Sequence, residues 1–394
     1  MKKIVTIGEL GIIITGNTPP RSNPKLYGNY TPFIKATDIS ETEKYTYHPE
    51  EYYSEEGYNK YIKSLIPKGS TCVVTIGSIG KKMTMAHCDL FINQAMNAII
   101  PNENFDNEYV YYAVKNILPN IKMLDSGTAS GRENVSKSAF SKMQILIEDN
   151  IITQRRIAEI LSRYDSLIEN YQKQIKLLEE SAQRLYKEWF VDLRFPGHEN
   201  TKIVDGVPEG WEKKSIAELG SFINGFAFKP SDWHSNGLPI IKIKEMGNGI
   251  SIDTPRNNGE RVPEKYLVTT GDLLFSWSAT LMVIVWTGEN GWLNQHLFKV
   301  IPKEGISREF VLQSISNGII EFSNLTTGST MKHIQRNKLD QVFVNFPCAE
   351  IMQEYNIFGE ALRRQIINIS SQIHKLTEAR DRLLPKLMSG EIEV

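Results

Sequence analysis

The sequence contains one arrangement twice, and this internal duplication restricts the possible folds more than any other feature. Ile7–Leu10 and Ile216–Leu219 both read Ile-x-Glu-Leu, and each is followed by a glycine-bearing turn. Two later pairs repeat with an offset of 201 residues (294 − 93 and 327 − 126): Asn93-Gln94 with Asn294-Gln295, and Ser126-Gly127-Thr128 with Thr327-Gly328-Ser329. Because order and spacing are both kept, the sequence predicts two copies of one folding unit.

Each copy ends in a long segment with the spacing of a coiled coil. In residues 152–190 the apolar positions are separated by four and three residues in turn, and residues 366–387 follow the same pattern. The seam residues that we expect to pair the helices are Ile157, Leu161, Tyr164, Ile168, Tyr171, Ile175, Leu178 and Leu185 in the first segment and Ile366, Ile369, Ile373, Leu376, Leu383 and Leu387 in the second. A single amphipathic helix packed on a globular core is the alternative, but helices of that kind average only about 11–12 residues.

The two helices are expected to pair antiparallel, because that direction lets each copy of the unit sit at an opposite end. The first helix would be roughly 58 Å long at about 1.5 Å per residue. Arg380 occupies one seam position of the second helix, and Pro385 near its end predicts a kinked or frayed last turn.

The composition is that of a globular protein with more than one domain. The chain has 394 residues, of which 41% are hydrophobic and 10% aromatic. Short β-rich runs between prolines and glycines precede each long helix, together with a helical pattern at residues 107–124. We therefore predict an α+β fold in which two similar mixed α/β domains are separated by two long helices that pair as an antiparallel coiled coil. The predicted boundaries are residues 1–150 and 201–349 for the domains, and residues 151–200 and 350–394 for the helical spacers.

Charged residues are balanced in total but segregated along the chain. The sequence has 45 basic and 46 acidic residues, a balance that neither supports nor excludes a polyanionic partner. Residues 1–37 nevertheless hold five lysines and arginines against Glu9, whereas residues 41–56 hold six glutamates against Lys44. The total therefore hides a basic segment followed by an acidic one.

Several classes of protein are disfavoured. The three cysteines, Cys72, Cys88 and Cys348, are far apart and form no CxxC or Cys/His cluster, which argues against a disulfide framework and a zinc site. No apolar run approaches the length of a membrane span, and Glu9 interrupts the apolar stretch near the N-terminus. We expect a cytoplasmic protein without a signal peptide.

No catalytic motif is complete. Asn17–Pro20 superficially resembles the Asn-Pro-Pro-aromatic motif of amino-methyltransferases, but Thr18 and Arg21 break the match. Gly77–Lys81 resembles a phosphate loop but has only two residues between its glycines where four are required, which favours a tight turn. We predict that the chain is not an enzyme by itself, with no catalytic residues and no metal site.

The repeated polar segments fit a nucleic-acid interface. Asparagine and glutamine can bond adenine, arginine and lysine can bond guanine or phosphate, and serine or threonine can bond phosphate. The candidate DNA-binding residues are Arg21, Lys35, Lys81, Lys82, Asn93, Gln94, Ser126, Thr128, Arg132, Asn134, Lys229, Lys242, Lys244, Asn294, Gln295, Thr327, Ser329, Lys332 and His333. The alternatives are that the two Asn-Gln pairs satisfy buried backbone groups and that the lysines and polar loops face only solvent.

Seven segments together carry a resemblance to a known family. They are Ile7–Leu10, Ile14–Pro19, Pro32–Ile39 and Gln154–Leu161 in the first half, and Trp211–Leu219, Pro239–Ile243 and Leu384–Ile392 in the second. They closely resemble the corresponding parts of Type I restriction–modification specificity subunits, and the resemblance covers essentially the full chain. The order of domain, helix, domain and helix is its specific feature, because the single motifs are weaker.

The resemblance implies that each α/β unit is a target recognition domain that reads one half of a bipartite, asymmetric, double-stranded DNA sequence. It also implies that the paired helices set the gap between the half-sites and dock two methyltransferase subunits, which restriction/motor subunits can join. No cofactor is expected on this chain, since S-adenosylmethionine, Mg and ATP belong to those partners. The second helix lacks an equivalent of Trp189-Phe190 and carries Arg380, which leaves the symmetry of the two methyltransferase contacts open.

Two other functions are compatible with parts of the sequence. A self-contained methyltransferase or nuclease would need a catalytic motif, and none is complete. A duplicated protein-interaction scaffold would explain the repeat, but it would not bind DNA in a salt-sensitive way.

Overall fold

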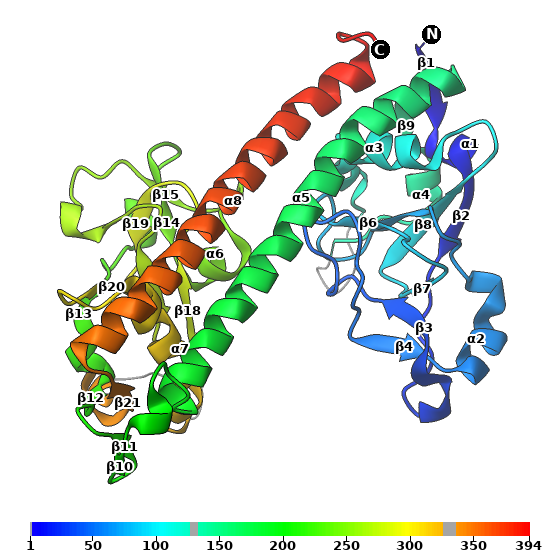
Figure 1. Cartoon of the computed structure of the whole chain (residues 1–394). Helices are drawn as coiled ribbons and strands as arrows, with labels where there is room; N and C mark the ends of the chain where they lie inside the picture. The colour runs from blue at the N-terminus through cyan, green and yellow to red at the C-terminus, as the bar shows by residue number, and fades with distance from the viewer. Residues whose placement is uncertain (1, 127–132, 326–335) are drawn as a thin grey trace. The chain divides into compact units, whose positions relative to one another are not determined.

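The computed structural model describes residues 2–126, 133–325 and 336–394 (Figure 1). Within it the chain divides into two compact units. The first unit consists of residues 1–170 and 375–394, and the second consists of residues 171–374. Both long helices cross this division, so each of them contributes one part to each unit.

The first unit is built on a four-stranded antiparallel sheet with the order β2-β8-β5-β6 and a three-stranded sheet with the order β4-β3-β7. A separate ribbon pairs β1 with β9. The strands are β1 (Lys2–Thr6), β2 (Gly11–Thr15), β3 (Tyr27–Ile34), β4 (Glu51–Tyr53), β5 (Thr71–Val74), β6 (Met83–Met85), β7 (Phe91–Ile92), β8 (Met96–Pro101) and β9 (Gln144–Glu148). The short helices are α1 (Ile7–Leu10), α2 (Glu55–Tyr61), α3 (Asn107–Ile117) and α4 (Lys137–Lys142).

The second unit repeats this topology. Its sheets have the orders β13-β20-β17-β18 and β15-β14-β19-β16, and its ribbon pairs β12 with β21. The strands are β12 (Glu212–Ser215), β13 (Gly220–Asn224), β14 (Leu238–Ile241), β15 (Arg256–Asn257), β16 (Leu267–Val268), β17 (Leu273–Ser276), β18 (Met282–Val285), β19 (Gly291–Leu293), β20 (Leu297–Pro302) and β21 (Phe343–Phe346). A small hairpin of β10 (Ile203–Val204) and β11 (Val207–Pro208) precedes them, and the helices are α6 (Ile243–Asn248) and α7 (Arg308–Asn324). The predicted duplication is therefore a duplication of strand order as well as of sequence.

The repeated tetrapeptide Ile-x-Glu-Leu forms the same short helical turn in both units. In each copy a hydroxyl residue precedes the turn and forms a capping box with the glutamate, Thr6 with Glu9 and Ser215 with Glu218. The isoleucine and leucine of both copies are fully buried. In both units the tetrapeptide therefore satisfies the backbone at the start of the turn and anchors the turn in the core.

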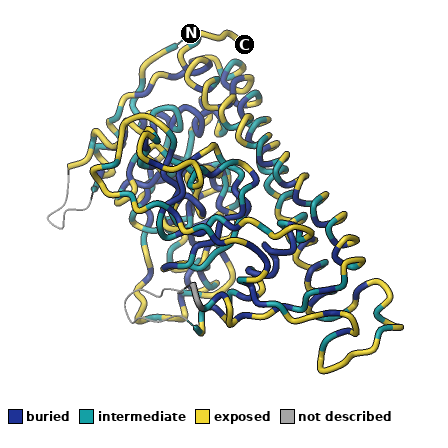
Figure 2. The backbone as a smooth tube through the Cα atoms, turned by 90° about the vertical axis from the view of Figure 1, so that its left-hand side faces the viewer, coloured by how far each residue is buried: buried dark blue, intermediate teal, exposed yellow. Residues whose placement is uncertain are grey.

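Each unit has its own hydrophobic core. In the first unit α3 is buried along most of its length and packs with β1, β9 and parts of both long helices. In the second unit the corresponding core gathers the aromatic residues of α7 and of the ends of the long helices. Figure 2 colours the buried stretches of the chain dark blue and the exposed stretches yellow.

The two long helices, α5 (Ile151–Tyr186) and α8 (Ala349–Ser389), run antiparallel (Figure 1). In the first unit the early residue Asp165 of α5 bonds the late residue Arg380 of α8. In the second unit Trp189, just after α5, lies against Tyr355 near the start of α8, with 5.9 Å between ring centroids. This order of contacts confirms the predicted direction of pairing.

The predicted seam faces inward to different extents. Five of its residues are buried, namely Ile157, Leu161, Ile168, Ile366 and Leu387. The others are half-buried, namely Tyr164, Tyr171, Ile175, Leu178, Leu185, Ile369, Ile373, Leu376 and Leu383. Three of the buried seam residues, Ile157, Leu161 and Leu387, also belong to the hydrophobic core of the first unit.

The expectation of a frayed last turn at Pro385 is wrong. Helix α8 contains Pro385 and continues to Ser389. Leu384, Leu387 and Met388 are buried in the core of the first unit, so packing holds the last turn although proline removes one backbone donor.

Arg380 interrupts the apolar seam because it has a buried partner. Its Nη1 lies 2.5 Å from Oδ1 of Asp165, and the two side chains are only 5% and 8% exposed. The hydroxyl of Tyr112 on α3 donates a further hydrogen bond to Asp165 at 2.6 Å. Burial by itself would raise the pKa of Asp165, but the positive charges of Lys115 and Arg380 lower it below its usual value.

We predict that Asp165→Ala lowers the free energy of unfolding by about 3–5 kcal/mol, because it removes the buried partner of Arg380 and leaves the guanidinium with only the exposed carboxylate of Asp381. Urea denaturation followed by far-UV circular dichroism measures the change. Glu378→Ala is the control on the same helix, since the exposed Arg382–Glu378 pair contributes only about 0.3–0.5 kcal/mol. Equal losses in the two variants would contradict a special role for the buried pair.

Candidate nucleic-acid interface

Parallel strands bring two of the predicted polar segments together in the first unit. Strands β3 and β7 pair in parallel through Phe33 with Phe91 and Ile34 with Ile92. The next residue of β7's segment, Asn93, donates its backbone N–H to the carbonyl of Ile34 at 3.0 Å. Lys35, Asn93 and Gln94 therefore leave the same edge of the sheet.

The second unit repeats this edge. Strands β14 and β19 pair in parallel, and Asn294 donates its backbone N–H to the carbonyl of Ile241 at 3.1 Å. Lys242 follows β14 as Lys35 follows β3, so Lys242, Asn294 and Gln295 are the counterparts. We call each set of three residues the strand-end site of its unit.

A glycine turn packs directly against each strand-end site. The N–H of Gly16 bonds the carbonyl of Met96, and the N–H of Gly225 bonds that of Leu297. A Cβ atom at Gly16 would lie 2.2 Å from the carbonyl oxygen of Ile92, and one at Gly225 would lie 2.1 Å from that of Asn294. The glycines in the repeated turns are therefore required by close backbone approach.

Two further segments adjoin the strand-end site of the first unit. Thr75 donates its N–H to the carbonyl of Ala95 at 2.8 Å and accepts the N–H of Val135 at 2.9 Å. The N–H of Gly77 bonds the carbonyl of Glu133 at 3.1 Å. Residues 75–77, which lead into the predicted tight turn, thus lie between the segment that contains Asn93 and Gln94 and residues 133–135.

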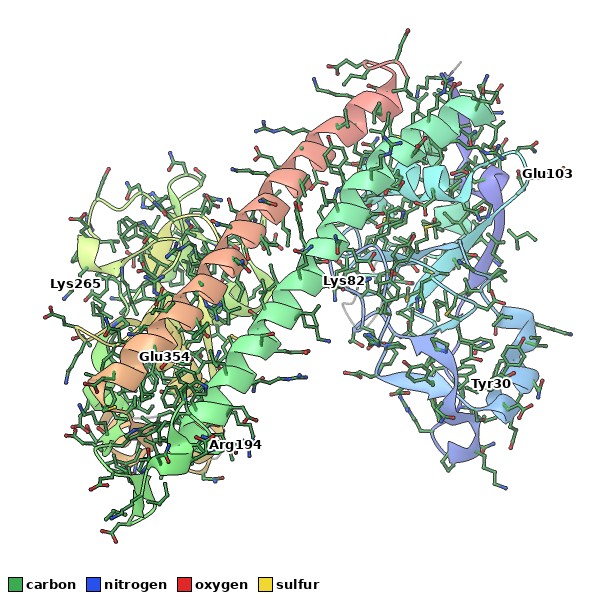
Figure 3. All side chains as sticks on the ribbon, in the orientation of Figure 1. Tyr30, Lys82, Glu103, Arg194, Lys265 and Glu354 are labelled. Carbon is green, nitrogen blue, oxygen red and sulfur yellow. The ribbon has the colours of Figure 1, made fainter. Side chains whose placement is uncertain are left out.

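The Gly77–Gly80 turn is confirmed by the backbone. Both glycines have positive φ angles, 91° and 76°, which favour glycine. Lys81 is exposed after the turn. The ammonium group of Lys82, which Figure 3 labels, donates to the carbonyl of Ala36 at 3.5 Å. That bond links this turn to the residue that follows Lys35.

The amide side chains of the two sites have different environments. Asn294 is 6% exposed, and its Oδ1 accepts the N–H of His296 at 3.4 Å, as expected for an asparagine that satisfies backbone groups. The Oδ1 of Asn93 is buried and has no hydrogen-bond partner among the described residues. Gln94 is exposed and accepts a hydrogen bond from Thr18, whereas Gln295 is half-buried with its Nε2 3.3 Å from the Nε2 of His296. The glutamines are thus the more accessible members of the two pairs.

Two predicted cations of the first unit are held by carboxylates. Arg21 forms an ion pair with Glu51, and the ammonium group of Lys35 lies 2.6 Å from Glu50 Oε2 and 3.1 Å from Glu51 Oε1. The hydrogen bond from Arg21, followed by that from Lys35, lowers the pKa of Glu51 although burial opposes the shift. The hydrogen bond to Glu50 raises the pKa of Lys35.

The remaining candidates are spread over both units. Lys242 lies over the ring of Trp233, 4.8 Å from its centroid, and Lys229 and Lys244 are exposed. Ser126 donates to the carbonyl of Asn134, whose own N–H bonds Asp125. Six candidates lie outside the described residues: Thr128, Arg132, Thr327, Ser329, Lys332 and His333.

The sequence did not single out Glu50, Glu51 or Trp233 as neighbours of the candidate cations. The acidic segment at residues 41–56 was the available signal, because it follows the basic segment that it contacts. Within the described residues, no group of three or more His, Cys, Asp or Glu side chains is placed to hold a metal ion. No helix in the same part of the chain is both long and apolar enough to cross a membrane.

Comparison with known families matches both halves of the chain. The family described as the Type I restriction modification DNA specificity domain matches residues 2–180 and 208–378. The chain belongs to this family. It is a specificity subunit of a Type I restriction–modification system, which recognises DNA and is not itself the catalyst.

Similar specificity subunits occur in other organisms. The Type I restriction enzyme MjaIX specificity subunit of Methanocaldococcus jannaschii is 25% identical over 413 residues, which cover 100% of this chain and 93% of the relative. The HindI specificity subunit of Haemophilus influenzae is 24% identical and covers 69% of this chain and 74% of the relative. The solved S subunit from M. genitalium shares the fold, with a TM-score of 0.56, 16% identity and coverage of 98% and 96% of the two chains.

We predict that Gly225→Ala lowers the stability of the second unit by about 1–3 kcal/mol, because the new Cβ atom forces the backbone of Asn294 to move. All six tryptophans lie in that unit, so urea denaturation followed by tryptophan fluorescence reports on it directly.

Gly247→Ala is the control for this substitution. Gly247 lies in α6, and its added Cβ would meet only the terminal carbon of Met282 at 3.7 Å. Alanine there should be neutral or stabilise by up to about 1 kcal/mol. A Gly225→Ala variant as stable as this control would show that the close approach is not required.

Proposed function

We propose that this specificity subunit binds a bipartite, asymmetric sequence in double-stranded DNA and reads one half with each unit. The observation that carries the proposal is the repetition of one strand order, one strand-end site and one glycine turn in both units. Two similar readers in one chain can address two half-sites, and the sequence differences between them allow the half-sites to differ. The target recognition domains are residues 1–150 and 201–349.

The strand-end sites are the proposed centres of DNA contact. Gln94 and Gln295 can bond base edges, whereas Lys35, Lys242 and their lysine neighbours can bond phosphates. The chemistry of the candidate set supports this role, because amides and cations meet where two parallel strands end. Asn294 is assigned a supporting role, since its side chain is buried and bonds the backbone.

The helical spacers, residues 151–200 and 350–394, are proposed to set the gap between the half-sites. Support comes from α5 and α8, each of which contributes to both units. The seam residues hold the pair together, and the distance along the helices then limits the separation of the half-sites that the chain can recognise.

The same helices are proposed to dock two methyltransferase subunits, which restriction/motor subunits join. Large apolar side chains are exposed along them: Ile152 and Leu177 on α5, and Ile357 and Phe358 on α8. Ile357 and Phe358 are adjacent in the chain, and contiguous exposed apolar groups favour protein partners. S-adenosylmethionine, Mg and ATP are assigned to those partners, and the chain itself is assigned no cofactor.

A chain that acted only as a protein-interaction scaffold would show no salt-sensitive DNA binding. A chain that were itself a methyltransferase would modify DNA without a partner. A DNA-binding titration at two salt concentrations and a methylation assay, each with and without the methyltransferase subunit, separate these functions from the proposed one.

The spacer role predicts the effect of lengthening both helices by one heptad. The insertions belong between Asn170 and Tyr171 in α5 and between His374 and Lys375 in α8, where the two units divide. Seven residues add about 10.5 Å, or about three base pairs of DNA, and keep the phase of the seam. Methylome sequencing should show unchanged half-sites with a longer gap.

The control places the same seven residues between Asp205 and Gly206, at the tip of the β10–β11 hairpin. That variant should keep both the half-sites and the gap. A changed half-site with an unchanged gap in the helix variant would contradict the proposed division between readers and spacer.

A further inference from the structure

The acidic segment of the first unit folds back onto two cations of its proposed DNA-contact surface. Glu51 lies on β4, which pairs with β3 through Phe33, and this pairing places its carboxylate between Arg21 and Lys35. The Oε1 of Glu51 accepts a hydrogen bond from the Arg21 guanidinium at 2.9 Å, and the Oε2 of Glu51 forms an ion pair with Nη1 of Arg21 at 2.9 Å. Lys35 bonds Glu51 and, more closely, Glu50. We call these four residues the carboxylate clamp.

The geometry of the clamp matches that of a phosphate contact. Arginine presents parallel donors that fit a carboxylate or a phosphate equally well, and lysine binds either as a point charge. The side chain of Arg21 is 62% exposed and that of Glu50 is 74% exposed, so solvent and DNA can reach the clamp. Each ion pair with an exposed member joins it to a more covered one, Arg21 to Glu51 at 23% exposed and Glu50 to Lys35 at 17% exposed. Ion pairs that solvent can reach are weak enough to exchange partners.

The second unit provides an internal comparison. The N–H groups of Lys35 and Lys242 bond the carboxylates of Asp38 and Glu245, three residues later in each case, which confirms that the two lysines correspond. Pro32 pairs with Tyr52 in the first unit, and Pro239 pairs with Arg256 in the second. By this alignment Thr254 and Pro255 occupy the positions of Glu50 and Glu51.

The lysine of the second unit therefore has a different neighbour. Lys242 lies over the indole ring of Trp233, which leaves its positive charge in place. In the first unit the charges of Arg21 and Lys35 are offset by two carboxylates. The two strand-end sites thus have the same backbone arrangement but differ in how much positive charge they offer to DNA.

We propose that Glu50 and Glu51 are specificity-determining residues that compete with DNA phosphates for Lys35 and Arg21. The proposal rests on the proposed DNA-binding function. On DNA of the wrong sequence the clamp stays closed, and the first unit adds little to binding. On the correct half-site, contacts with the bases hold the DNA backbone close enough for its phosphates to displace the carboxylates of Glu50 and Glu51. The second unit, which has no such acidic pair at the aligned positions, supplies more of the contact with nonspecific DNA.

The test compares Glu50→Gln/Glu51→Gln with the wild-type chain, each in complex with the methyltransferase subunit. Binding to labelled duplex DNA of scrambled sequence is measured by fluorescence anisotropy between roughly 50 and 200 mM salt. The double variant should bind roughly threefold to tenfold more tightly at the lower salt, and the slope of log K against log salt should steepen by about one to two. Affinity for the cognate sequence should change less, so the ratio of specific to nonspecific affinity falls.

Two controls separate the clamp from a simple change of net charge. Glu41→Gln removes an exposed carboxylate from the same acidic segment and should have a much smaller effect. In a background with Arg21→Gln and Lys35→Gln, the gain from the double variant should disappear, since the released cations are absent. Thermal melting followed by circular dichroism checks that all variants fold.

Three results would decide against parts of this account. A double variant that behaves like Glu41→Gln would overturn the clamp, and so would a double variant that binds scrambled DNA more weakly. If the wild-type complex showed no salt-sensitive DNA binding at all, the proposed function itself would fail, which is a different outcome from a failure of the clamp alone.

Discussion

The structure depends on two arginines of α8 that are buried against carboxylates. Arg380 bonds Asp165 of α5 in the first unit, and Arg363 donates from Nε to Glu309 of α7 at 2.7 Å in the second. A shift of α8 by one turn would separate these arginines from Asp165 and Glu309 and leave both carboxylates buried without their arginine partners, which is far more costly than the loss of an apolar contact. The leucines and isoleucines of the seam could tolerate several registers, whereas the two arginines allow one. Polar pairs therefore fix the register of α8 in each unit, against α5 in the first and against α7 in the second.

The two units carry equivalent strand-end sites that differ in the charges around them. The parallel strand pair and the glycine turn are determined by backbone geometry, and both units keep them. The side chains around them are free to change, because they contribute little to the core. Glu50 and Glu51 in the first unit and Trp233 in the second give equivalent lysines opposite surroundings. Duplication followed by change at such positions can produce two readers with different sequence preferences and different tolerance for nonspecific DNA.

The repeat, the strand-rich domains and the pairing of the long helices could be predicted from the sequence, because they rest on periodicity and local spacing. Arg380 was visible as an exception to the seam, but its partner Asp165 was not, since they lie far apart in the chain and no local pattern joins them. The effect of Pro385 could not be predicted from the local sequence, because it depends on the tertiary packing of Leu387 and Met388. The carboxylate clamp needed the pairing of β3 with β4, although the segregation of charge in the first 56 residues indicated that oppositely charged segments were available to meet.

We propose that this specificity subunit directs methylation to two different half-sites at a fixed separation. Long-read methylome sequencing of cells that express the chain with its methyltransferase subunit tests the claim most directly. We expect one asymmetric motif with two short specified halves, a gap of constant length without sequence preference, and one methylated base in each half. An uninterrupted motif, a palindromic motif with identical halves, or the absence of any methylated motif that depends on this chain would contradict it.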